Sequence, residues 1–162
     1  MRVPEFDDAA ALRAWRDRTL YRRLMRAARA EASQTLAQIH QHGYTDVSLT
    51  DTTLLANLDT DGCTITDLAR RAGVTRQAAS QQVAALVKSG YLHTRPSDTD
   101  GRAVTVIQTD RGRALLRTAL EIVARLETGY AAAIGERRVT ELQKALDLLL
   151  SHIDPDGWLG PP

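Results

Sequence analysis

The sequence predicts a mainly helical α+β fold that contains one small β-hairpin. Two short helical patterns separated by a tight turn lie between residues 65 and 89. Two β-like runs follow, on either side of a turn-rich loop. Long stripes of apolar residues at helical spacing precede and follow this segment. Together these features predict a winged helix-turn-helix, with the hairpin as its wing, flanked by N- and C-terminal helices.

The N-terminal stripe covers residues 8–42, which are expected to form one helix ending at Gly43. A helix of this length would extend over about 50 Å, too far for so small a domain to cover alone. Another surface must therefore shield part of its apolar side. Residues 50–58 are expected to form a short helix, and the turn of residues 59–62 leads into the helix-turn-helix.

The long N-terminal helix also carries a basic row, for which two interpretations are open. Acidic neighbours favour a solvated face, and contact with DNA is the alternative. The row consists of Arg22, Arg26 and Arg29, and its acidic neighbours are Asp17 and Glu31.

The first helix of the pair is expected to begin at Thr66, whose hydroxyl can accept a free amide hydrogen of the first turn. Gly73 follows where a left-handed backbone is needed, and Thr75 supplies a second N-cap two residues later. Two helices so close in sequence must cross at a steep angle.

The second helix, residues 76–89, separates into two faces. One face has the spacing of a buried stripe and carries Ala79, Val83, Leu86 and Val87. The other is polar but nearly uncharged, which favours hydrogen bonding to base edges in the DNA major groove over an ordinary solvated helix. Thr75 is expected to contact phosphate, and the other expected DNA contacts are Arg76, Gln77, Ser80, Gln81 and Lys88.

Residues 91–95 and 102–108 are expected to form the two strands of the wing. Arg102 lies just past the tip, where a guanidinium can enter the minor groove. Asp98 and Asp100 are expected to support the wing, one of them bracing Arg102. A solvent-exposed hairpin with an incidental ion pair is the alternative.

The wing tip and the start of the next helix carry motifs that resemble the MarR-type family of winged helix-turn-helix transcriptional regulators. The likeness is densest over residues 49–116. At the wing tip, Gly101 stands where the family commonly has another arginine, which predicts a less basic wing. The residues that carry the resemblance are Pro96, Asp98, Asp100, Arg102 and the Thr-Asp-Arg-Gly-Arg segment at 109–113.

Two apolar helices are expected after the wing, one capped by Thr109 and one at residues 136–153. Apolar helices at both ends of the chain favour a homodimer, because two-fold pairing doubles the contact with DNA; a closed monomeric bundle is the alternative. The resemblance implies the same arrangement. Within this single MarR-like chain we expect a dimerisation region at residues 8–48 and 114–153, a DNA-binding module at 49–113 and a tail at 154–162.

The charge distribution agrees with DNA as the partner. The net charge is only +1, but residues 64–113 hold 8 basic and 4 acidic residues, a balance of +4. Residues 1–63 have a balance of −1 and residues 114–162 a balance of −2. The positive charge therefore lies on the segment expected to bind double-stranded DNA, where it would release counterions.

Several other functions find no support in the sequence. We find no catalytic constellation, phosphate-binding glycine loop or metal-ligand spacing, so we expect neither an enzyme nor a metal or cofactor site. The sequence has no apolar run long enough for a membrane span and no signal peptide, which predicts a cytoplasmic protein. The lone Cys63 fits a reducing compartment and is expected to be a partly buried thiol.

These features predict a homodimeric, sequence-specific transcriptional regulator that binds a palindromic operator, with half-sites about one helical turn apart. The resemblance implies a repressor that releases DNA when a small aromatic effector binds between the dimerisation helices and the DNA-binding module. Two alternatives remain: a winged helix that binds a protein instead of DNA, and a redox-responsive regulator acting through Cys63. Candidate residues of the effector cleft are Trp15, Tyr21, Tyr44 and Tyr130.

Overall fold

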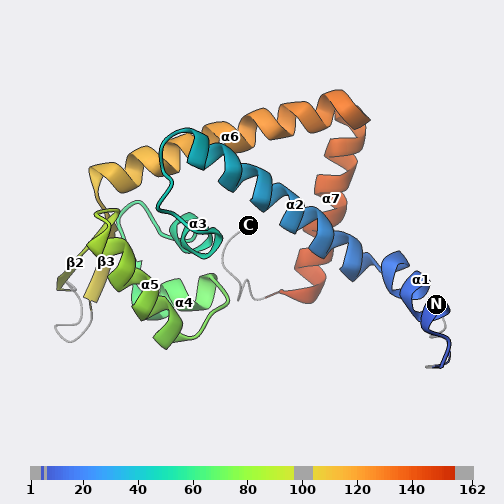
Figure 1. Ribbon diagram of the computed structural model, residues 1–162, viewed down its shortest axis with the longest axis horizontal. Helices are drawn as coiled ribbons and strands as arrows, with labels where there is room; N and C mark the ends of the chain where they lie inside the picture. The colour runs from blue at the N-terminus through green and yellow to red at the C-terminus, as the bar shows by residue number, and fades with distance from the viewer. Residues whose placement is uncertain (1–4, 6, 97–103, 156–162) are drawn as a thin grey trace.

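The computed structural model describes residues 5, 7–96 and 104–155, in which helices predominate and short strands form one sheet (Figure 1). The predicted α+β class with a small wing is confirmed. In chain order the elements are α1 (Ala9–Arg18), α2 (Leu20–Gln41), α3 (Leu49–Ala56), β1 (Cys63–Thr64), α4 (Ile65–Arg71), α5 (Arg76–Lys88), β2 (Leu92–Pro96), β3 (Val104–Gln108), α6 (Asp110–Ile134) and α7 (Glu136–Ile153).

The prediction of a single helix over residues 8–42 is wrong, because Thr19 divides it into α1 and α2. Thr19 has an extended backbone (φ −66°, ψ 143°), and its hydroxyl oxygen accepts the amide hydrogen of Arg22 at 3.2 Å. A threonine side chain that bonds to nearby backbone groups competes with the helix and starts a new one. The apolar stripe continues across this break, so periodicity alone did not reveal it.

Two helices begin slightly earlier than predicted. Ser48 caps α3 in a reciprocal capping box with Asp51. Thr64 caps α4: its hydroxyl oxygen accepts the amide hydrogen of Asp67 at 3.1 Å, and the hydroxyl donates to the Asp67 carboxylate at 2.7 Å. Thr66 lies inside the first turn of α4, so its assignment as the cap is wrong.

A third strand completes the sheet of the wing, in the order β1-β3-β2 with antiparallel neighbours. β1 has only two residues, too few to show strand periodicity, and Cys63 in it pairs with Val106. Just before it, Gly62 has a φ of 88°, and a Cβ there would stand 2.4 Å from the carbonyl oxygen of Val106. Only glycine lets the chain enter the sheet this closely.

The hydrophobic core joins the module to the adjacent parts of α2 and α6. α4 packs on α5, and α3 contacts α2, α5 and α6. The module and the long helices therefore share one core. Its largest fully buried side chains are Tyr91, Ile39, Leu54, Leu68, Leu92, Leu115, Ile122 and Val106.

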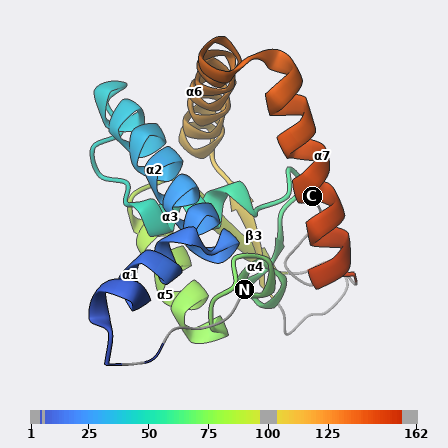
Figure 2. The same cartoon turned by 90° about the vertical axis from the view of Figure 1, so that its right-hand side faces the viewer.

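α6 forms one long edge of the molecule, and α7 turns back from its far end at Gly135 (Figure 1). α2 and α7 cross in that view, but the rotated view in Figure 2 shows that they lie apart. α7 has no buried residue in the single chain, so its apolar side chains need another surface. Of the helices described, none is both long and apolar enough to cross a membrane.

Candidate nucleic-acid interface

α4 and α5 form the helix-turn-helix, joined by a turn in which Gly73 has a φ of 65°. The amide of Val74 donates to the carbonyl oxygen of Ala69 at 3.0 Å, which closes the end of α4. Thr75 caps α5 as predicted, because its hydroxyl oxygen accepts the amide hydrogen of Ala78 at 3.1 Å. Backbone groups at both helix ends are thus hydrogen-bonded within this short turn, which holds the two helices at a defined crossing.

α5 turns one face to the core and the other to solvent. Ala79, Val83 and Leu86 are buried as predicted. Val87 is 38% exposed, so its assignment to the buried stripe is wrong; the helix turns by about 80° over the eight residues from Ala79. The solvent face holds the predicted DNA contacts, all of them exposed: Thr75, Arg76, Gln77, Ser80, Gln81 and Lys88.

A hollow of about 380 Å³ lies beside this solvent face, lined by Ile65, Arg76, Gln77, Ser80 and Gln81. Ile65 begins α4, and the other four residues come from the first half of α5. Hydrogen-bond donors and acceptors therefore gather at the N-terminal part of the second helix, the part that contacts base edges in helix-turn-helix proteins. The small side chain of Ser80 leaves room for a base edge to approach the helix.

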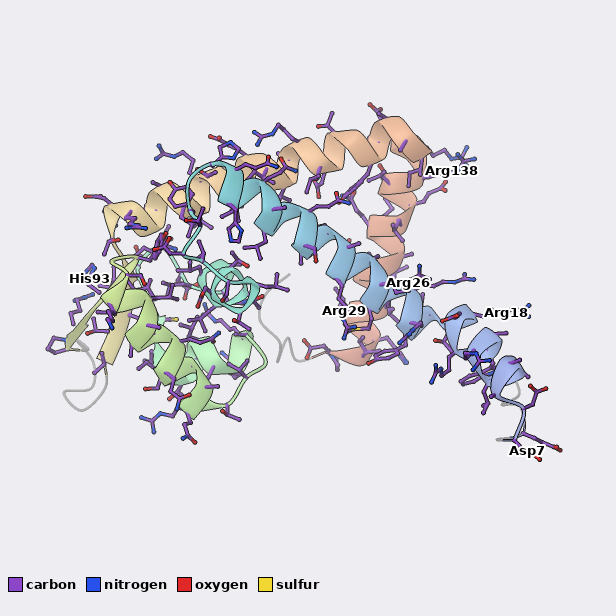
Figure 3. The ribbon with its side chains drawn as sticks, viewed as in Figure 1. Asp7, Arg18, Arg26, Arg29, His93 and Arg138 are labelled. Atoms are coloured by element: carbon purple, nitrogen blue, oxygen red, sulfur yellow. The ribbon has the colours of Figure 1, made fainter. Side chains whose placement is uncertain are left out.

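The wing strands β2 and β3 pair in register from Leu92 opposite Gln108 to Pro96 opposite Val104. On β2, His93 is exposed, and Figure 3 shows it at the end of the molecule opposite to α1. The predicted contacts at the wing tip lie outside the described residues: Arg102, Asp98 and Asp100.

The Thr-Asp-Arg-Gly-Arg segment fastens α6 to the root of the wing. The Thr109 hydroxyl donates to the Gly90 carbonyl oxygen at 2.6 Å, and its oxygen accepts the amide hydrogen of Gly112 at 3.1 Å. The Thr109 backbone amide donates to the Tyr91 carbonyl oxygen at 3.0 Å. A Cβ on Gly112 would stand 2.2 Å from that same carbonyl oxygen, so only glycine allows this approach. Arg113 then donates to the carbonyl oxygen of Gln108 at 2.8 Å.

Three side chains distant in sequence meet where the module joins the long helices. The Tyr91 hydroxyl donates to Asp46 Oδ1 at 2.6 Å. Arg111 donates to Asp46 Oδ2 and to the Tyr91 hydroxyl oxygen, both at 2.9 Å, and its guanidinium carbon lies 4.4 Å from the centre of the Tyr91 ring. No spacing pattern marks this cluster in the sequence, because Asp46 and Tyr91 are 45 residues apart.

The Asp46–Tyr91–Arg111 cluster changes the acidity of its members. The hydrogen bond from Tyr91 lowers the pKa of Asp46, and the charge of Arg111 lowers it further. Burial of Tyr91, together with its hydrogen bond to the Asp46 carboxylate, raises the pKa of the phenol. Asp46 is therefore ionised and Tyr91 protonated at neutral pH, which fixes the donor and acceptor of each hydrogen bond.

The four aromatic candidates for an effector cleft lie in different surroundings. Tyr44 follows the C-terminal end of α2, where its ring centre is 6.4 Å from that of Tyr91. Tyr21 is 72% exposed and lies near the start of α2, about 30 Å from the other end of that helix. Trp15 is on α1 and Tyr130 on α6. One small ligand therefore cannot touch both Tyr21 and Tyr44 within a single chain.

Cys63 is a buried, free thiol in β1. Burial raises the pKa of this thiol, which lowers the fraction of reactive thiolate. The structure therefore favours a packing role for Cys63 over oxidant sensing. In the part of the chain that the structure describes, no group of three His, Cys, Asp or Glu side chains is placed to hold a metal ion.

Known proteins share both the motif and the architecture. The sequence profile described as MarR family matches residues 45–103, which run from the loop before α3 through the helix-turn-helix and into the wing. Over these residues the chain is similar to the MarR family. Solved transcriptional regulators are among its structural neighbours.

Three solved structures are similar to this chain in fold. The transcriptional repressor CouR bound to a 23-mer DNA duplex is 25% identical; the match covers 81% of our chain and 92% of CouR, with a TM-score of 0.65. A MarR family protein of Mycobacterium tuberculosis in complex with salicylic acid is 26% identical, with coverages of 82% and 97% and a TM-score of 0.62. The transcriptional regulator BldR of Sulfolobus solfataricus is 24% identical, with coverages of 83% and 94% and a TM-score of 0.67.

One curated relative shares a segment with this chain. The LexA repressor of Deinococcus radiodurans is 36% identical over 89 residues, which make up 55% of our chain. The chain spans about 40% of the length of that relative, so this likeness concerns a shared segment.

Proposed function

We propose that this chain is a DNA-binding transcriptional regulator of the MarR type, and that it forms a homodimer that binds a palindromic operator, with α5 of each protomer in one half-site. The observation that carries the proposal is the exposed polar face of α5, in which Arg76, Gln77, Ser80 and Gln81 line a hollow while the opposite face is buried. A helix held in place by its buried side can present such groups to base edges. In this proposal Thr75 and Lys88 contact phosphate and Arg102 enters the minor groove.

The apolar surface of the long helices supports pairing with a second copy. α7 buries no residue in the single chain, and an isolated helix of about this length is only marginally stable in water. Pairing would place residues 8–48 and 114–153 of both protomers in one dimerisation region and leave the module of each protomer, residues 49–113, free for DNA. The exposed large apolar side chains on these helices are Leu20, Tyr21, Met25, Leu120, Tyr130, Ile134, Leu142, Leu148, Leu150 and Ile153.

The proposed regulator is a repressor that responds to a small aromatic effector. CouR is a transcriptional repressor, and the Mycobacterium tuberculosis relative was solved with salicylic acid. An effector that favours one spacing of the two modules would lower the affinity for an operator that requires another. Because Tyr21 and Tyr44 lie at opposite ends of α2, a cleft that includes both must use two protomers. The proposed cleft residues are Trp15, Tyr21, Tyr44 and Tyr130.

Selection of bound fragments from random DNA with the purified chain tests operator binding. We expect a palindrome, and we expect Gln77→Ala to weaken binding to it by about 1–3 kcal/mol, the usual value of a bidentate hydrogen bond between a side chain and a base. Gln143→Ala, at an exposed glutamine on α7, is the matched control and should bind as the parent does. Failure to enrich any sequence would favour a protein partner; a palindrome that Gln77→Ala binds normally would exclude Gln77 from base recognition.

The wing is tested separately with Arg102→Ala. We expect weaker operator binding at moderate salt and little change in the free energy of unfolding, because the guanidinium is assigned to the minor groove. An affinity equal to that of the parent would contradict this role.

Sedimentation tests the dimer, and salicylate is the probe for the effector. Leu148 is 73% exposed on α7, so Leu148→Glu should place a charge in the proposed interface and produce monomers. A dimer that tolerates this change would have its interface elsewhere. Salicylate should lower the affinity of the parent for the selected palindrome, and an unchanged affinity would exclude salicylate as an effector.

A further inference from the structure

α1 and the first half of α2 carry a second positive surface, separate from the module. Residues 9–30 contain seven arginines and one acidic residue, a balance of +6 in a chain whose net charge is +1. A charge count over residues 1–63 conceals this surface, because nearly all acidic residues of that segment lie outside 9–30. We name it the arginine face; its members, all exposed, are Arg13, Arg16, Arg18, Arg22, Arg23, Arg26 and Arg29.

Within the described residues, few acidic side chains neutralise the arginine face. Over the described ranges, its one ion pair joins Arg22 to Asp17 at 3.6 Å, with both side chains about half exposed (48% and 58%). An ion pair of this kind contributes little and leaves the local charge almost unchanged. A surface that is charged only for solubility commonly mixes the two signs. Here one sign dominates, so the face fits a polyanionic partner.

Part of the face forms a row. Arg22, Arg26 and Arg29 lie at intervals of four and three residues along one side of α2 and cover about 10 Å of the helix axis. They line a hollow of about 220 Å³ together with Tyr21 and Met25, so the row lies at the border of the apolar surface assigned above to the proposed dimer. Each strand of duplex DNA presents one phosphate per about 3.4 Å of its axis, so the row can face several phosphates. A site for a small anion would enclose its ligand, whereas these arginines are all exposed.

The arginine face and α5 lie toward the same side of the molecule. α1 and α5 both lie along the lower side in Figures 1 and 2, whereas α6 forms the upper edge. Figure 3 shows Arg18, Arg26 and Arg29 along the two N-terminal helices, at a distance from His93 on the wing. A duplex that follows this lower side would meet the wing, then α5 and then the N-terminal helices.

A second copy of the chain offers no matching acidic surface on its long helices. α6 and α7 together contain six acidic residues and seven lysines or arginines. On α7, Glu136, Glu141 and Asp147 are five and six residues apart, so they form no acidic row at successive turns. Charge complementarity therefore favours DNA over the partner subunit.

We propose that the arginine face binds the phosphate backbone of the DNA beyond the bases contacted by α5. Such contacts raise affinity and carry no sequence information. The inference rests on the proposed function, because the duplex must first be held by α5. Binding through the face would also make the affinity depend more steeply on salt.

The test compares two variants that lose the same positive charge. The first combines Arg22→Gln, Arg26→Gln and Arg29→Gln. The control replaces three exposed arginines, one on α6 and two on α7, and combines Arg125→Gln, Arg137→Gln and Arg138→Gln. Figure 3 shows Arg138 at the upper corner between α6 and α7, away from the lower side. Binding of a fluorescent random-sequence duplex is measured by anisotropy over a range of salt concentrations.

We expect the slope of log affinity against log salt to become shallower by about 0.9 for each phosphate that the protein no longer neutralises, hence by about 2–3 in the first variant. The control should keep the slope of the wild type. Equal changes of slope in both variants would mean that the slope follows the net charge of the protein and would overturn the inference. An unchanged slope in the first variant would also overturn it. So would conversion of the first variant alone to a monomer, which would assign the face to the subunit interface.

The same measurements separate this inference from the proposed function. A wild-type chain that binds neither this duplex nor any selected palindrome would defeat both. A wild-type chain that binds this duplex, with the two variants indistinguishable from it, would defeat only the arginine face.

Discussion

Replacing Tyr91 with phenylalanine removes one hydroxyl group and leaves the buried ring in place. That hydroxyl donates to Asp46 at 2.6 Å and accepts from Arg111 at 2.9 Å, so it ties the loop before α3 and the start of α6 to the root of the wing. A hydrogen bond to a charged group contributes about 1.5–3 kcal/mol. The Arg111–Asp46 ion pair remains in the variant, and its side chains are 50% and 44% exposed, so water compensates for part of the loss.

We therefore expect Tyr91→Phe to lower the free energy of unfolding by about 1–2 kcal/mol. The assay is urea denaturation followed by circular dichroism, with an unchanged dependence on urea concentration. Tyr44→Phe is the matched control, because it makes the same change on the ring beside Tyr91. Over the described part of the chain, the Tyr44 hydroxyl has no hydrogen bond, so its removal should change the free energy by less than about 0.5 kcal/mol.

Two results would refute this reasoning. A Tyr91→Phe variant as stable as the parent would mean that water replaces both hydrogen bonds without loss. Equal losses in Tyr91→Phe and Tyr44→Phe would mean that the effect belongs to the aromatic pair and not to the Asp46–Tyr91–Arg111 cluster.

Three further changes test other parts of the structure. Because folding lowers the pKa of Asp46, its carboxylate stabilises the protein above about pH 4 and loses this effect on acidification. The difference in the free energy of unfolding between the parent and Asp46→Asn should therefore shrink from neutral to acidic pH. A constant difference would contradict this. Gly112→Ala should lower the free energy of unfolding by about 2–3 kcal/mol, because its Cβ would stand 2.2 Å from the Tyr91 carbonyl oxygen. The control Gly129→Ala, which has open space around it, should be neutral or stabilising. Equal effects of the two substitutions would argue against the clash. For the buried Cys63, hydroperoxide should affect DNA binding equally in the parent and in Cys63→Ser, and a response confined to the parent would identify a redox switch.

The helix-turn-helix was predictable because its signals are local. Thr75 caps α5 through an amide three residues away, and the buried positions Ala79, Val83 and Leu86 follow helical periodicity. Where two local signals compete, the sequence is ambiguous: Thr64 and Thr66 are both threonines that could cap the same helix, and the hydrogen bonds to Asp67 show that Thr64 does so. The short strand β1 exists only because it pairs with β3, so no pattern within its own two residues indicates it.

The sequence by itself determined the helix-turn-helix, the two strands of the wing and the polar face of α5, because each depends on residues a few positions apart. Tertiary structure alone decided how the module is attached to the long helices: Asp46, Tyr91 and Arg111 meet only when the chain is folded. It also decided which apolar and basic surfaces remain without a partner, namely the side chains of α7 and the arginine face. Periodicity shows that a helix has two faces, but only the packing around it determines which of them the protein itself covers.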